Sequence, residues 1–473
     1  AMDPHAPTYL WSEDVGEVDE AGGVVAPVLM ALEEPPDGAA TAHSWLDPLT
    51  GRLDATSDAA REVWLAPAGA QNGVAPGHFP KCPRCGARAT DVMDHVTKGD
   101  EPFQEIVSAQ LLEQPARAGI ETPLHGRKAL IFSDGRQAAS RLAGKLRQFS
   151  LRDSVRPLLL AGFGALNERF GIDAPLSHSY VALLAACVKY RVHLRPAQAP
   201  HFDNDLKAFR ALWSTDLATD RDLFDISAEL NSARVNKALC LALYPVLTDP
   251  YTGMSALALA APAANLSLPE QQAFARLPAP PNTAGLTDDE AREALLSLWL
   301  QESMRRRALW LPTTPAEWLD ASEGAKIKRT TGTFPNRLRD VVSSRWFTRN
   351  LQSQRGRPSP WGQFLQSVFA HNSTANGYVL KASKVRLIRE GLVWRRCMTC
   401  TTVQPANPLV GDRCMMRHPN AGNCTGQTEP LDPETDRVFR ARKGHLRALT
   451  ERLTRDGDRG WAPHPFVAAE HSA

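Results

Sequence analysis

Four cysteines near the end of this 473-residue chain constrain its fold more than any other feature. Cys397 and Cys400 are separated by two residues, and Cys414 and Cys424 follow within a short distance. A C-x2-C turn holds one metal ion from a tight loop, and two further thiolates complete the tetrahedron that zinc prefers. We therefore predict a structural Zn²⁺ ion in a zinc-ribbon-like element over residues 396–430.

For the second half of this site, the sequence allows two sets of ligands. Cys414 and Cys424 have the spacing C-x9-C, which is wider than the first pair, and His418 lies between them. His418 is the alternative to one of the cysteines. Four thiolates leave no coordination position for water, which argues against a free-standing metalloenzyme.

A second knuckle begins at Cys82 and ends at Cys85, and Gly86 after it permits a tight turn. One pair is half a metal site, so His78, His95 or remote cysteines would have to complete it. A metal-free turn is the alternative.

The cysteine count also indicates the compartment. Six of the eight cysteines fall in these clusters, which suits metal binding under reducing conditions better than a disulfide framework, and Cys187 and Cys240 lie in apolar helical sequence as expected core residues. No run approaches the roughly 18 to 20 apolar residues that a membrane span needs, and the start lacks a signal-peptide pattern. We expect a cytoplasmic protein without a membrane partner.

Residues 127–149 indicate a strand, a tight turn and a helix. Residues 129–132 are apolar enough for a buried strand, and apolar side chains then recur at helical spacing. Such junctions in α/β sheets hold phosphates, so Ser133, Arg136 and Gln137 are candidate nucleic-acid contacts. A purely structural turn is the alternative.

Residues 128–139, Lys-Ala-Leu-Ile-Phe-Ser-Asp-Gly-Arg-Gln-Ala-Ala, resemble motif IV of superfamily 2 DEAD/DEAH-box helicases. The resemblance is to large bacterial helicases with a cysteine-rich (DUF1998-associated) C-terminal region, as in mitomycin repair and in DISARM-type or Druantia-type antiphage systems. The knuckle at Cys82 and Cys85 followed by residues 97–103, and the closing Ala-Glu-His-Ser-Ala, are also similar to that group. Gly135 stands where serine is common. The resemblance implies part of the second RecA-like lobe.

Several helicase motifs are missing from the sequence. It contains no G-x-x-x-x-G-K-[ST] phosphate loop, no Asp-Glu-Ala-His or Asp-Glu-Ala-Asp box and no paired arginines of motif VI. We expect this polypeptide not to hydrolyse ATP alone, with ATP and Mg²⁺ confined to a larger parent protein. Residues 1–4 read like a vector remnant, and both ends look cut.

The fold class that we predict is mixed α/β and α, with a partial RecA-like lobe, a large helical insertion and the zinc element. Within the insertion, helices are expected at 179–190, 206–213, 230–244 and 288–310. The predicted order is a strand and loop segment at 1–75, the knuckle and half-lobe at 76–150, the insertion at 151–345, a basic and winged-helix-like segment at 346–395, the zinc knuckle at 396–430, and a basic helix with the lead-in to motif V at 431–473.

A basic run with aromatic residues precedes the zinc element. Lys and Arg neutralise phosphates, and exposed rings stack on unpaired bases, so the run suits single-stranded or forked DNA. Trp346, Phe347 and Trp361 are the aromatic residues, for which a place in the core is the alternative. Residues 378–388 alternate apolar and basic side chains, as in one strand with a positive face. The candidate contacts are Arg345, Arg349, Lys381 and Lys384.

Two hypotheses for function follow. The first is an accessory and partial motor region of an ATP-dependent DNA helicase or translocase, in antiphage defence or DNA repair. The second is a protein-interaction module that docks a partner subunit of such a complex.

Overall fold

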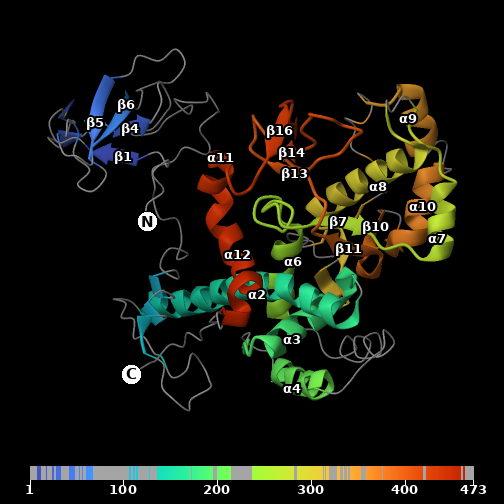
Figure 1. Ribbon diagram of the computed structural model, residues 1–473, viewed down its shortest axis with the longest axis horizontal. Coiled ribbons are helices and arrows are strands. Elements are labelled where there is room, and N and C mark those ends of the chain that lie inside the picture. The colour runs from blue at the N-terminus through green and yellow to red at the C-terminus, as the bar shows by residue number, and fades with distance from the viewer. Residues whose placement is uncertain are drawn as a thin grey trace. The chain divides into compact units, whose positions relative to one another are not determined.

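The computed structural model places two compact units, Ala1–Gly99 and Asp100–Ala473, which are described separately (Figure 1). The structure describes residues 8–11, 17–18, 24–25, 28–32, 42–47, 53, 56, 60–67, 106–107, 110–111, 113–115, 127, 136–171, 173–194, 200–214, 237–281, 285–312, 314, 316–318, 327–330, 334, 338, 341–352, 358–374, 377–418, 422–459 and 462–463.

The described part of the first unit consists of short antiparallel strands. They are β1 (Thr8–Trp11), β2 (Glu17–Val18), β3 (Val24–Val25), β4 (Val28–Leu32), β5 (Ala42–Leu46) and β6 (Arg61–Pro67). Four of them form a sheet in the order β1-β4-β6-β5, and β2 pairs with β3. Leu46, Val63 and Leu65 are buried, whereas Trp45 and Glu62 are exposed, so β5 and β6 bury one face of their pleat.

Helices make up most of the described part of the second unit. They are α2 (Arg136–Phe170), α3 (Ser179–Lys189), α4 (Pro200–Ser214), α6 (Lys237–Thr248), α7 (Leu268–Ala275), α8 (Asp288–Arg305), α9 (Ser344–Leu351), α10 (Pro360–Phe369), α11 (Arg437–Phe439) and α12 (His445–Asp456). The sequence starts α8 with a capping box, in which Thr287 and Glu290 bond to each other's backbone amides. The prediction that α8 reaches residue 310 was wrong. Arg307 has a φ of 58°, and a left-handed residue ends a helix.

Helix α2 runs through the predicted boundary at residue 150 without a break. It packs closely on α3, because a Cβ on Gly162 would lie 2.0 Å from the backbone oxygen of Ala182. Cys187 of α3 and Cys240 of α6 are buried in this core, as predicted. The apolar run at 129–132 lies outside the described residues, so the RecA-like lobe stays a prediction.

Small sheets connect these helices. The strands are β7 (Ala261–Ala264), β8 (Leu309–Trp310), β9 (Ala370–Thr374), β10 (Gly377–Lys381), β11 (Val385–Ile388), β12 (Trp394–Cys397), β13 (Val403–Pro405), β14 (Arg417–His418), β15 (Gly422–Asn423) and β16 (Thr428–Leu431). Strands β8, β10 and β9 form one sheet, β11 and β7 another, and β13, β12 and β16 a third. Strand β7 packs on α8, and β10 and β9 pack on α10 (Figure 1).

The single strand predicted over residues 378–388 was wrong. A 3-10 turn at Ala382–Lys384 divides it into β10 and β11, which belong to different sheets. Tyr378, Val379 and Leu380 are all buried, because both faces of β10 are covered, so the alternation in the sequence does not produce one solvated face.

The aromatic residues of the basic run belong to the core. Phe347 and Trp361 are 2% and 0% exposed, and the indole nitrogen of Trp361 donates to Pro278 O at 3.0 Å. Trp346 is half-buried and packs on the same core. Base stacking by Phe347 or Trp361 is therefore excluded. None of the helices in the described part of the chain combines the length and apolar character required to cross a bilayer.

Candidate metal centre

The sheet β13-β12-β16 carries the first cysteine pair. Strand β12 ends at Cys397, a turn leads to Cys400, and the chain returns through β13. Thr401 has a φ of 56°, the left-handed conformation that closes this turn. Cys397 N donates to Thr402 O at 3.0 Å, which fixes the loop. A C-x2-C knuckle therefore forms from local backbone geometry.

The second pair is brought together by a hairpin between its members. Strands β14 and β15 pair antiparallel, and Cys424 N donates to Met416 O at 2.9 Å. The antiparallel pairing of β14 and β15 returns the chain to the site, so the wide C-x9-C spacing still places Cys424 beside Cys414. His418 lies in β14, and its side chain lies outside the described residues.

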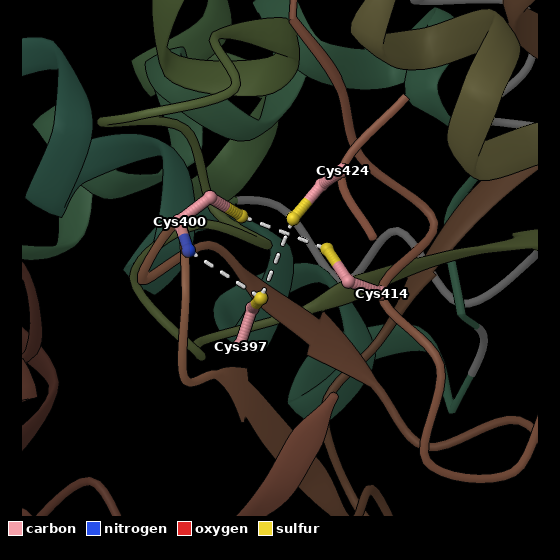
Figure 2. A group of neighbouring side chains, drawn as sticks. All are labelled: Cys397, Cys400, Cys414 and Cys424. Atoms are coloured by element: carbon pink, nitrogen blue, oxygen red, sulfur yellow. Dashed lines mark hydrogen bonds between the residues drawn. The ribbon is translucent and has the colours of Figure 1, made fainter. Parts of the chain in front are cut away.

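The four sulfur atoms form a compact cluster. All lie within 4.8 Å of one another, with 3.7 Å between Cys397 Sγ and Cys424 Sγ and 3.6 Å between Cys400 Sγ and Cys414 Sγ. Figure 2 shows the four side chains converging on one point. A tetrahedron with Zn–S bonds of about 2.3 Å has edges of about 3.8 Å. The cluster could therefore hold a metal such as zinc.

Backbone amides point at three of these sulfur atoms. Thr399 N and Cys400 N donate to Cys397 Sγ, Met416 N to Cys414 Sγ and Gly426 N to Cys424 Sγ, each at 3.4 Å. Amide donors stabilise the negative charge of metal-bound thiolates, because a hydrogen bond to the charged form favours it. The turn geometry thus supports metal binding beyond the presence of four cysteines.

The cluster disfavours free thiolates. The hydrogen bond with Cys400, together with burial, raises the pKa of the Cys414 thiol above its ordinary value. Burial raises the pKa of Cys424 to about 11. Thiolates at neutral pH therefore need a cation between them, and metal binding would release the thiol protons.

Gly426 leaves room for the cluster. A Cβ at this position would lie 2.7 Å from Cys397 Sγ and 2.5 Å from Thr399 Oγ1. Any other residue would displace the first knuckle. Sequence reasoning overlooked Gly426, although a glycine two positions after a cysteine is a signal for such a turn.

Two side chains, Arg396 and Asn407, anchor the sheet β13-β12-β16 to neighbouring helices. Arg396 is 7% exposed, and its guanidinium pairs with Asp436 at 3.0 Å and with Glu429. Asp436 also caps α11 by accepting a hydrogen bond from Phe439 N. Asn407 Nδ2 donates to Ala294 O of α8 at 2.8 Å.

A π-helical segment, Arg440–Gly444, joins α11 to α12 beside the centre. Arg442 donates to Thr401 Oγ1 in the first knuckle at 3.1 Å. Lys443 donates to Ala256 O, and Arg447 donates to Leu257 O and Ala258 O. Helix α12 then packs on α2. Basic residues of this predicted helix therefore hold the sheet β13-β12-β16 against the helical core.

The candidate nucleic-acid contacts lie on different structural elements. Arg345 and Arg349 are exposed on α9, and Lys381 is half-buried at the end of β10. Lys384 Nζ lies 2.6 Å from a carboxylate oxygen of Glu270, which gives it a structural partner.

The remaining candidates lie at or beyond the edge of what the structure describes. Arg136 and Gln137 begin α2, but their side chains are outside the described part. Ser133, the pair Cys82 and Cys85, and the alternative ligands His78 and His95 also fall outside it.

The fold and the site together define a protein of mixed helix and strand with a buried four-cysteine cluster suited to a metal ion. The chain is 31% identical over 195 residues to the Druantia protein DruE of Escherichia coli (strain UMEA 4076-1). The match covers 37% of this chain and only 10% of DruE. No family model and no solved structure matches the chain. The similarity supports a relationship to Druantia-type proteins.

Proposed function

We propose that this chain is part of a Druantia-type antiphage defence protein and forms a zinc-stabilised accessory region that binds nucleic acid. The similarity to DruE carries the defence assignment. The four-cysteine cluster supports a structural role for zinc, because all four positions of a tetrahedral ion are taken by sulfur. We assign ATP hydrolysis to other parts of the parent protein, and a partial RecA-like lobe to residues 76–150 of this chain.

The defence role is tested by infection. Deleting the gene in its native host is expected to raise the plating efficiency of susceptible phages, and the wild-type gene is expected to restore protection. The same gene with Cys397→Ser is expected to fail, because it loses a metal ligand. Unchanged plating efficiency after deletion, across a broad phage panel, would contradict this role.

Nucleic-acid binding is tested with the full chain. Fluorescence anisotropy with labelled DNA is expected to show binding at low salt, and log K is expected to fall linearly with log salt concentration. Each phosphate contacted contributes about −0.9 to that slope on duplex DNA. Binding that ignores salt, or no binding at low salt, would count against a direct nucleic-acid role.

A docking role for this region has less support. Few large apolar side chains are exposed in the described part of the second unit, for example Leu268, Val393 and Met398. Isolated exposed apolar residues are ordinary on soluble proteins, whereas docking surfaces are contiguous patches. We therefore favour nucleic acid over a protein partner for the basic region.

A further inference from the structure

Helix α9 separates its side chains into a buried face and a basic face. Ser343 caps the helix, and its Oγ accepts a hydrogen bond from Trp346 N. Phe347, Asn350 and Leu351 are buried against the core. The opposite face is exposed and consists of Ser344, Arg345, Thr348 and Arg349.

The charges on this face are unfavourable for the helix itself. The first turn holds no acidic residue, and Arg345 lies there, at the positive end of the helix dipole. Arg349 follows at i+4, where a like charge destabilises a helix. Among the residues that the structure describes, neither arginine has a carboxylate partner. Local conflicts of this kind are expected at functional sites.

The surrounding sequence is predominantly basic. Residues 341–389 contain eight Lys and Arg and no Asp or Glu, and Asp340 and Glu390 flank this stretch. Within that stretch, Lys384 and Arg386 are neutralised by Glu270 and Asp173, which come from elsewhere in the chain. Arg345 and Arg349 keep their charge exposed, which is complementary to a polyanion.

We propose that the exposed face of α9 binds the phosphodiester backbone of nucleic acid, with Arg345 and Arg349 as the contacts. This inference rests on the proposed nucleic-acid-binding function and specifies its site and mode. Phe347 and Trp361 are buried, so these two rings do not present a free face for a base, and Trp346 is half-buried against the core. Exposed arginines are common phosphate ligands, and phosphate is carried by every nucleotide. Binding at α9 is therefore expected to depend little on base sequence.

The test compares two double variants of the full chain. Arg345→Gln with Arg349→Gln removes the α9 charges, while Arg455→Gln with Arg459→Gln removes two exposed charges from the last turn of α12 and the 3-10 turn Gly457–Arg459 after it. Anisotropy titrations with labelled duplex and single-stranded DNA are run at several KCl concentrations. The α9 variant is expected to lower the magnitude of the salt slope on duplex by about 2 and to weaken binding at low salt at least tenfold. The α12 control is expected to stay near the wild type.

Further measurements separate a contact from a structural role. The melting temperature of the α9 variant is expected to stay level or rise, because a like-charge pair is removed. Arg345→Lys with Arg349→Lys is expected to keep most of the salt slope, since lysine also neutralises phosphate.

The possible failures are distinguishable. No DNA binding by the wild type would overturn the proposed function itself. Wild-type binding that the α9 variant retains in full would overturn only the α9 site. A strong preference for one base in single strands, or equally tight binding of polyglutamate, would overturn the phosphate-backbone mode.

Discussion

Replacing Cys397 with serine is expected to remove one equivalent of zinc per chain and to unfold the sheet β13-β12-β16. Cys397 Sγ accepts two backbone hydrogen bonds and lies 3.7 Å from Cys424 Sγ, so it is central to the cluster. Structural zinc sites contribute on the order of 10 kcal/mol to folding at neutral pH, because the unfolded chain lacks the preformed site. This is the largest single effect expected in the described part of the chain.

Metal analysis by mass spectrometry measures the zinc loss, and hydrogen exchange of the amides in β12 and β16 measures the unfolding. Cys187→Ala is the matched control, since that thiol is buried in the helical core and should leave the zinc content unchanged. Gly426→Ala should weaken zinc binding without removing a ligand, because its Cβ would collide with Cys397 Sγ. An unchanged zinc content in Cys397→Ser would show that the cluster is not the metal site.

Replacing Arg396 with alanine is expected to destabilise the second unit by about 3–5 kcal/mol, because a buried carboxylate would lose its partner. The Arg396 side chain is 8% exposed, and that of Asp436 is 13% exposed. Urea unfolding, followed by the fluorescence of Trp394 and its neighbours, gives the free energy of unfolding. The sheet is expected to detach from α11 before the helical body unfolds.

Two further variants isolate the cause. Arg386→Ala breaks an ion pair whose side chains are 37% and 51% exposed, and surface pairs contribute at most about 1 kcal/mol. Asp436→Asn with Arg396→Ala should recover part of the loss, since asparagine still caps Phe439 N and carries no charge. An Arg396→Ala effect as small as that of Arg386→Ala would remove Arg396 from its proposed role as the link between sheet and helix.

The local parts of the fold were predictable because they depend on neighbouring residues. The helix predicted at 179–190 matches α3 to within one residue, and the helix predicted at 206–213 lies within α4, since apolar periodicity acts over a few residues. The overrun of the predicted helix at 288–310 has a local cause too, the left-handed Arg307, but arginine carries no sequence signal for that conformation. The predicted domain boundary at residue 150 was placed where the resemblance to the helicase motif ends, and this criterion could not show that α2 continues past that residue.

The sequence alone determined that four cysteines form a candidate metal site. A C-x2-C pair followed closely by two further cysteines is a pattern typical of metal binding. Only the tertiary structure decided that Cys424 joins Cys414 through the β14–β15 hairpin, and that Gly426 makes room for both knuckles. The tertiary structure also decided which basic side chains have no ion-pair partner among the described residues and can contact a ligand. Lys384 is neutralised by Glu270, 114 residues away, whereas Arg345 and Arg349 face solvent. Charge and aromatic content can be counted in the sequence. Ion pairing and side-chain burial depend on contacts between residues distant in the sequence, and local sequence patterns do not predict those contacts.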